Sequence, residues 1–333
     1  MNMRTKLYMI ALAAMTMILG SCSDPNSEFS QDYLADTPIK LNVSVDEPTT
    51  RAGYSDEDKP TGFVLEVKNN KADKYNYLVW VEGEDNNWKT YKYGKYLFLN
   101  IKEEVTMLWA NMNDNVKISA MSDINYHYAE RVNKLPTDQT TLDALKKADL
   151  LATPYTQVAP TQNGINVELK HVMSKINLTI ELGSEYEFSK EDVDTKITDV
   201  KIDGSKVEAN YELKTSTDNP QFKFDNYGDP TPIFPYHTGT TPYSKTTGTI
   251  TKAKATYEAI LIPQTIASGN FTISFKVDGK LYEWTYNKEL TLASTTAYTL
   301  KLIAGDDKVQ PVSFSVAPWN AGNGENGEEK ETD

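Results

Sequence analysis

The sequence predicts an all-β protein made of two β-sandwich domains in tandem, behind an N-terminal export signal. Apolar and polar residues alternate along most of the chain, which is the period of a strand with one buried face. Thr, Tyr, Val and Ile, the residue types that strands favour, are abundant. One segment alone, residues 142–147, has the pattern of a helix. Many short strands with few helices are typical of β-sandwiches.

The N-terminal residues have the pattern of a lipoprotein signal peptide. Arg4 and Lys6 precede the apolar run 7–19, which is shorter than the roughly 20 residues of a membrane-spanning helix. The run ends in Leu-Gly-Ser before Cys22, the only cysteine of the chain. We expect residues 1–21 to be removed and Cys22 to carry lipid with acyl chains such as palmitate. An ordinary signal peptide with a chance cysteine is the alternative.

Cysteine content and charge limit what the exported part can be. With its cysteine used for lipid, the chain has none left for disulfides and must depend on its apolar cores. About 280 residues are enough for two cores of ordinary size. The 34 basic and 47 acidic residues give a net charge of -13. That balance disfavours nucleic acid and anionic lipid as partners.

Five segments show the strand alternation most clearly, each with one apolar face. These faces are Leu41, Val43 and Val45; Phe63, Leu65 and Val67; Ile176, Leu178, Ile180 and Leu182; Tyr298, Leu300 and Leu302; and Val312, Phe314 and Val316. We expect a strand at each of them.

A β-hairpin is predicted around Asp278-Gly279, the preferred pair for a type I′ turn. A two-residue turn fixes the register of the two strands. The pairs that follow are Val277 with Lys280, Phe275 with Tyr282, Ile273 with Trp284, and Phe271 with Tyr286. Asp203-Gly204, between Val200 and Val207, predicts a second hairpin with less apolar support.

Three further segments have simple interpretations. Thr140 is the expected N-cap of the 142–147 helix, with Asp143 in a capping box. The Pro- and Thr-rich residues 226–249 predict a long surface loop. Residues 320–333 are acidic and nearly free of apolar residues, and we expect them to be disordered.

Candidate catalytic or metal sites are missing from the sequence. His127, His171 and His237 are scattered without metal-ligand spacing, so each is expected to be structural or exposed. The chain has no Gly-x-Ser-x-Gly elbow and no phosphate-binding glycine loop. We therefore predict no enzyme activity, no metal and no cofactor.

The tryptophans Trp80, Trp88 and Trp109 allow two interpretations. They pack in cores or across strands, as most aromatic residues in strands do. Alternatively, they form an exposed platform on which sugars stack. Trp88, in the polar run 84–89, is the one we expect to be most exposed.

Four motifs occur in order along nearly the whole mature chain. They are the lipobox at Cys22; the strand 39–45 followed by Thr50-Arg51-Ala52; the central runs Asp149-Leu150-Leu151-Ala152 and 165–176; and the strand 298–302 followed by Val316-Ala317-Pro318-Trp319. Together they resemble the Bacteroidales-type fimbrillin family, the lipoprotein pilins of type V fimbriae. The resemblance implies two transthyretin-like β-sandwich domains and a subunit of a surface fimbria that serves adhesion.

The resemblance also implies an assembly route. In that family a trypsin-like protease cuts after an arginine, the first strand leaves, and a strand of the next subunit fills the groove. Strand addition pairs free backbone groups and buries apolar surface. Here the cut would fall between Arg51 and Ala52. The displaceable strand would be that of Leu41, Val43 and Val45, and the donor strand that of Val312, Phe314 and Val316.

The predicted organisation has five parts. They are the signal peptide (1–21), a lipidated tether and propeptide with the first strand (22–51), an N-terminal domain (52–174), a C-terminal domain that includes the candidate donor strand 310–319 (175–319), and the tail (320–333). The expected partners are other fimbrial subunits, the cell outer membrane through the lipid, and a host or bacterial surface receptor. Two alternatives stay open: a surface glycan-binding lipoprotein, and an anchor or tip subunit that does not polymerise.

Overall fold

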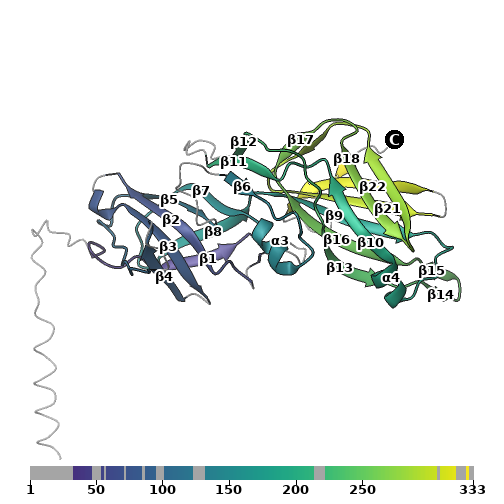
Figure 1. Cartoon of the computed structure of the whole chain (residues 1–333). Helices are drawn as coiled ribbons and strands as arrows, with labels where there is room; N and C mark the ends of the chain where they lie inside the picture. Colours follow the sequence, from purple (N-terminus) through teal and green to yellow (C-terminus); the bar gives the residue numbers. More distant parts are fainter. Residues whose placement is uncertain are drawn as a thin grey trace, which may run out of the picture. The chain divides into compact units, whose positions relative to one another are not determined.

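The computed structural model describes most of the chain (Figure 1). The described residues are 33–46, 54–55, 58–70, 73–84, 87–94, 101–122, 132–213, 222–305, 308–319 and 328–329. Within them the elements are almost all β-strands, so the all-β prediction is confirmed. None of the helices in these ranges is long and apolar enough to cross a membrane.

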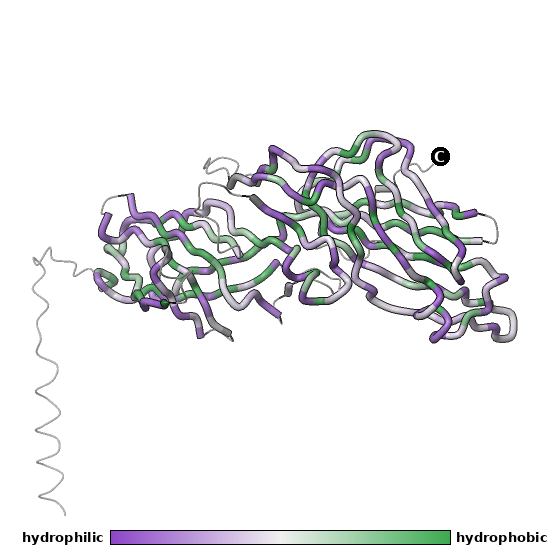
Figure 2. Tube along the Cα trace, in the orientation of Figure 1, coloured by the Kyte–Doolittle hydropathy of each residue, from purple (hydrophilic) through white to green (hydrophobic). Residues whose placement is uncertain are grey.

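The largest sheet has seven strands. Their order is β1 (Leu41–Val45), β8 (Ile165–His171), β7 (Leu151–Val158), β5 (Val116–Met121), β2 (Gly62–Asn69), β3 (Tyr77–Glu84) and β4 (Asn87–Lys92). Of the ladders in this sheet, β1–β8 is parallel and the others are antiparallel. Burial alternates residue by residue along β8. Figure 2 shows hydrophobic and hydrophilic residues interspersed along the strands.

A six-stranded sheet and smaller sheets follow. The six strands are β13 (Tyr236–Thr241), β16 (Lys254–Leu261), β9 (Ser174–Leu182), β21 (Thr296–Ala304), β22 (Val309–Pro318) and β23 (Glu328–Glu329). Two sheets have three strands: β10 (Ile197–Asp203), β18 (Phe271–Val277) and β19 (Lys280–Tyr286); and β12 (Phe222–Asp225), β11 (Glu208–Leu213) and β6 (Val132–Lys134). Two pairs remain: β14 (Ser244–Thr246) with β15 (Thr249–Thr251), and β17 (Gln264–Ile266) with β20 (Leu290–Leu292).

Buried apolar side chains form two core clusters. The first draws its members from residues 34–169. The second draws nearly all of its members from residues 135–319, with Val64 and Met121 as the exceptions. The short helix α3 (Leu142–Ala148) packs Leu145 and Ala148 into the second cluster, although it precedes Lys175 in the chain. The boundary at Lys175 stays a prediction.

The Asp278-Gly279 hairpin is confirmed in its register. The pairs in β18 and β19 are Phe271 with Tyr286, Ile273 with Trp284, Phe275 with Tyr282, and Val277 with Lys280. Asp278 and Gly279 both have positive φ values, 49° and 83°, as a type I′ turn requires. Local turn chemistry was therefore sufficient to fix this part of the fold.

The second expected hairpin, at Asp203-Gly204, is wrong. β10 and β11 do not pair with each other, since β10 pairs with β18 while β11 pairs with β6 and β12. Gly204 has a φ of +90°. A Cβ there would lie 2.0 Å from the carbonyl oxygen of Asn270. This glycine permits a close approach of two backbones rather than a hairpin turn.

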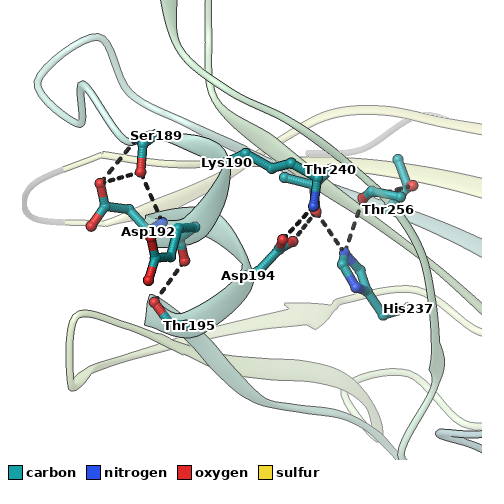
Figure 3. A network of polar contacts seen from close by, with 10 residues as sticks. Ser189, Lys190, Asp192, Asp194, Thr195, His237, Thr240 and Thr256 are labelled. Atoms are coloured by element: carbon teal, nitrogen blue, oxygen red, sulfur yellow. Dashed lines mark hydrogen bonds and ion pairs between the residues drawn. The ribbon is translucent and has the colours of Figure 1, made fainter.

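Both α-helices differ from expectation. The N-cap of α3 is Thr141, not Thr140, because the Thr141 hydroxyl accepts from the Ala144 backbone N–H. The helix α4 (Lys190–Lys196) was not predicted. It begins with a capping box between Ser189 and Asp192, shown in Figure 3. Val193 is its single buried residue, so it has no apolar periodicity for a sequence pattern to detect.

The contacts next to that capping box join α4 to β13 (Figure 3). The Thr240 hydroxyl donates to the Asp194 carboxylate, and Lys190 pairs with the same side chain. β13 is the edge strand of the six-stranded sheet. The predicted surface loop 226–249 is therefore wrong in part, because β13 and β14 lie within it. In the tail, Glu328 and Glu329 pair with β22, and the disorder expected for the rest falls outside the described residues.

Glycine substitutions can test the reason given for Gly204. Gly204 and Gly279 both have positive φ, which costs a non-glycine residue about 1–3 kcal/mol. Only Gly204 also faces a backbone clash, since a Cβ at Gly279 meets nothing within 4 Å. We expect Gly204→Ala to lower the free energy of unfolding by roughly 1–3 kcal/mol more than Gly279→Ala does. Urea unfolding measures both, and equal losses would contradict the close-approach explanation.

Candidate functional site

The first strand lies at the edge of the seven-stranded sheet. β1 pairs in parallel with β8, from Leu41 with Ile165 to Val45 with Leu169. Val43 and Val45 are buried in the first core cluster, and Leu41 is half-buried against it. The strand and its apolar face are therefore as predicted. A central strand bonded along both sides could not leave without breaking two ladders, whereas an edge strand breaks one.

Both ends of β1 are fixed to β8. The Ile165 N–H donates to the Lys40 carbonyl oxygen, and the Asp46 N–H donates to the Leu169 carbonyl oxygen. Gly164, with a φ of +90°, allows the first approach, because a Cβ there would lie 2.7 Å from the Lys40 oxygen. The strand is thus held by one complete ladder and a buried face.

A groove of about 400 Å³ runs along the start of β1 on the side away from β8. Two sets of backbone bonds flank it. The Ile39 N–H donates to the Met107 carbonyl, and the Val105 N–H donates to the Thr90 carbonyl of β4. The groove is lined by residues 39–42, 87–90 and 104–107. At Leu41 and Asn42, the open side of β1 therefore faces a hollow rather than a packed strand.

The expected lipidation and cleavage residues fall outside the described residues. These are Cys22, Arg51 and Ala52, and their roles stay predictions. The chain is described again at Tyr54, three residues beyond Arg51. Its backbone N–H donates to the Asp149 carboxylate over 3.1 Å. The segment after the expected cut is thus attached at a defined point.

The candidate donor strand is β22, which pairs antiparallel with β21. Phe314 is buried and Val316 is half-buried against the second core cluster. Val312, however, is 48% exposed. The register shifts between Lys301 and Leu302, whose partners are Ser313 and Pro311, so Val312 is the extra residue of a bulge. The expected common face of Val312, Phe314 and Val316 is therefore wrong within this chain.

The tryptophans do not form an exposed platform in the described residues. Trp109 is 1% exposed and belongs to the first core cluster. Trp80 packs against the second cluster instead. Trp88 is half-buried, as Trp80 is, with its ring edge-on to Phe63 at 5.6 Å between centroids. Whether Trp88 is the most exposed of the three stays a prediction. This arrangement agrees with the core interpretation and removes the main support for glycan binding.

The quoted sequence motifs converge in one buried cluster, which the sequence alone did not reveal. The His171 Nδ1 lies 2.9 Å from the Asp149 Oδ1, and both side chains are buried. The His171 ring stacks on Trp319, with 4.6 Å between centroids and 9° between planes. The Lys175 Nζ lies 5.1 Å from the centre of the Trp319 ring. Asp149, His171 and Lys175 belong to the central runs of the resemblance, and Trp319 belongs to its last motif.

The electrostatics of this cluster are dominated by burial. Burial lowers the pKa of the Lys175 ammonium, against the attraction of Glu258 and Asp149. Burial also raises the pKa of the Glu258 carboxyl, against the attraction of Lys175. Charged forms are costly in this environment even when opposite charges are near. In the described part of the chain, no group of three or more His, Cys, Asp or Glu side chains is arranged to hold a metal ion.

Comparison with known families shows which family the chain belongs to. Residues 50–319 match the model of the family described as fimbrillin-like. The chain belongs to this family. The resemblance noted from the sequence motifs is thereby confirmed, and fimbrillin-like proteins are fimbrial or adhesion subunits of the cell surface. The family is one of structural rather than catalytic proteins.

Two crystal structures of candidate cell adhesion proteins share the fold of this fimbrillin-like chain. One, from Bacteroides ovatus ATCC 8483, has a TM-score of 0.54 at 12% identity, covering 86% of this chain and 98% of that one. The other, from Bacteroides uniformis ATCC 8492, has a TM-score of 0.50 at 14% identity, covering 85% and 98%. At these identities the similarity concerns the fold alone. No curated protein matches this chain.

The buried carboxyl of Glu258 predicts a pH dependence of stability. Its pKa is raised above the ordinary value of 4.5 in the folded chain. From pH 4.5 up to the raised pKa, the folded state holds a proton that the unfolded state has lost, so the free energy of unfolding falls as pH rises. We expect Glu258→Gln to flatten this fall, and Glu283→Gln, on an exposed side chain, to leave it unchanged. Urea unfolding at pH 4.5 to 8 measures the slopes, and parallel slopes for wild type and Glu258→Gln would refute the assignment.

Proposed function

We propose that this fimbrillin-like protein is a fimbrial subunit that is exported as a lipoprotein and assembled at the cell surface by strand replacement. Lipid on Cys22 anchors the precursor to the outer membrane. Cleavage between Arg51 and Ala52 frees the chain from the lipid and frees β1 from the rest of the chain. A strand equivalent to β22 of the next subunit then takes the place of β1.

The edge position of β1 carries this proposal. Removing β1 unpairs one side of β8 and uncovers the core around Val43 and Val45. The residues just before β1 would leave with it, and their backbone bonds to Met107 and Trp109 would break as well. The groove beside β1 gives an incoming strand room for larger side chains than those of β1. The family match covers residues 50–319, which includes nearly all of the described chain that would remain after the cut.

The donor role of β22 requires a change in that strand. Val312, Phe314 and Val316 have the same spacing as Leu41, Val43 and Val45. Within its own chain the bulge turns Val312 outwards. In a regular ladder with β8 of another subunit, no bulge separates the three residues, and all of them point to one face. The same segment therefore has an exposed Val312 before assembly and a continuous apolar face after it.

The arginine content of the chain allows a clean cleavage test. From Asp24 onwards the only arginines are Arg51 and Arg131. We expect an arginine-specific protease to cut wild type and Arg131→Ala after Arg51, with oligomers appearing afterwards. Arg51→Ala stays monomeric under the same treatment. Mass spectrometry locates the cut and native sizing reports the assembly. Cutting after Arg51 without any change in size would instead identify an anchor or tip subunit.

The hold of the cut chain on β1 can be measured separately. Val43→Ala and Val45→Ala each remove two buried methyl groups, worth about 0.8 kcal/mol apiece. We expect each variant to release the 24–51 fragment at least about tenfold faster after cleavage than wild type does, since about 1.4 kcal/mol corresponds to a factor of ten. Ser44→Ala, in the same strand, is the control and should not change the rate. Release at one rate in all four chains would show that β1 is not what retains the fragment.

A further inference from the structure

A chain of contacts leads from the segment after Arg51 to the end of the last long strand. The Tyr54 N–H donates to the Asp149 Oδ2, and the Asp149 Oδ1 lies 2.9 Å from the His171 Nδ1. The His171 ring stacks on the indole of Trp319. Trp319 directly follows β22. Four contacting residues thus join positions 54 and 319, which are 265 residues apart in sequence.

Trp319 anchors the end of β22. Its indole is 3% exposed. Its backbone N–H donates to the Thr295 carbonyl, and the Thr295 N–H donates to the Met173 carbonyl. The segment that holds Trp319 is therefore fixed to the connection between β8 and β9, which directly follows His171. Displacing the His171 ring removes one of the contacts that keep the indole in place.

If this group of buried residues served only to pack the core, it would be an unfavourable choice of side chains. The His171 Nε2, the Trp319 Nε1 and the Glu258 Oε2 are all buried without a hydrogen-bond partner. Leaving a buried polar atom without a hydrogen bond lowers the stability of the folded chain. Apolar side chains of similar volume would hold β22 at lower cost. What apolar side chains cannot provide is a dependence of the indole position on a hydrogen bond from Tyr54.

We propose that Asp149, His171 and Trp319 form a latch that couples the segment after Arg51 to β22. While Tyr54 donates to one carboxylate oxygen, the other oxygen orients the His171 ring against the indole. When Tyr54 moves away, the buried carboxylate loses a donor, the ring loses its fixed orientation, and the end of β22 is held less firmly. The coupling is a property of the single chain, and its use in assembly rests on the proposed function.

Reciprocity follows from the same linkage. A ligand or substitution that loosens β22 also weakens the hydrogen bond from Tyr54 to Asp149. The factor equals that by which loss of this bond loosens β22. The latch therefore connects the two segments that strand replacement has to mobilise. The three latch residues supply a connection between them.

Two substitutions at one position isolate the coupling. Tyr54→Pro removes the donating N–H, whereas Tyr54→Ala removes the ring and keeps the N–H. Hydrogen exchange of residues 309–319, measured by mass spectrometry on the uncut chain from Asp24, reports how firmly β22 is held. We expect exchange in Tyr54→Pro to be about fivefold faster or more than in Tyr54→Ala. Equal exchange in the two variants would overturn the latch.

A second background separates the latch from simple destabilisation. His171→Phe keeps an aromatic ring for stacking and loses the bond to Asp149. In that background we expect Tyr54→Pro and Tyr54→Ala to exchange alike, because the coupling is already broken. A difference that persists would show that the effect of Tyr54 reaches β22 by another route, and would also overturn the proposal. Both measurements use monomers, so a failure of assembly after cleavage at Arg51 leaves the test of the latch intact.

Discussion

The structure depends on a strand that is paired on one side and buried on one face. β1 contributes Val43 and Val45 to the first core cluster, so the cluster is incomplete without a strand in this position. It contributes to a single ladder, that with β8. An edge strand of this kind contributes to the core while taking part in a single strand ladder, which is what the proposed replacement requires. A central strand could not have both properties.

A sheet edge that can accept a strand can also pair with the wrong chain. Features of β22 limit such pairing at the six-stranded sheet. β22 contains Pro311 and a bulge at Val312, features that disfavour pairing of an exposed edge with another chain. Glu328 and Glu329 pair with its far end at Ser315 and Val316. If β22 acts as the proposed donor strand, these features would keep it from pairing with another precursor before assembly.

The sequence predicted what is decided locally and missed what is decided by distant partners. The register of β18 and β19 follows from a two-residue turn, so Asp278-Gly279 was sufficient. Asp203-Gly204 is the same pair of residue types, but β10 pairs with β18. Its glycine is required because the backbone of Asn270, distant in sequence, lies close to it. The bulge at Val312 depends on how β22 meets β21, which alternation cannot show. For α4, the Ser189 to Asp192 capping spacing was the available signal, because one buried residue gives no period.

The candidate site likewise has features that the sequence predicts and features that depend on distant partners. Alternation located the apolar face of β1, but nothing in residues 41–45 reveals a parallel partner more than a hundred residues away. His171 had no metal-ligand spacing, and the absence of a metal pattern said nothing about a stacked ring. Its partners, Asp149 and Trp319, lay in motifs quoted for the resemblance, yet only the fold places those motifs together. The sequence motifs contain these residues, and the topology of the fold brings them into contact.

The balance of energies explains why a peptide bond is a suitable switch for such a strand. In the uncut chain β1 competes for its position at an effective concentration of about millimolar, because a short linker tethers it. The two buried valines contribute roughly 1.5–3 kcal/mol each, and a ladder hydrogen bond about 0.5–1.5 kcal/mol. The proposed cleavage would leave these contacts intact and would remove only the tether. A released fragment at micromolar concentration or below then loses about a thousandfold, roughly 4 kcal/mol, against an incoming strand. In the proposed exchange, an incoming strand that places Phe314 where β1 has a valine would bury more apolar area than β1 does. Replacement of β1 would then be favoured once the tether is cut, although β1 keeps all its contacts before the cut.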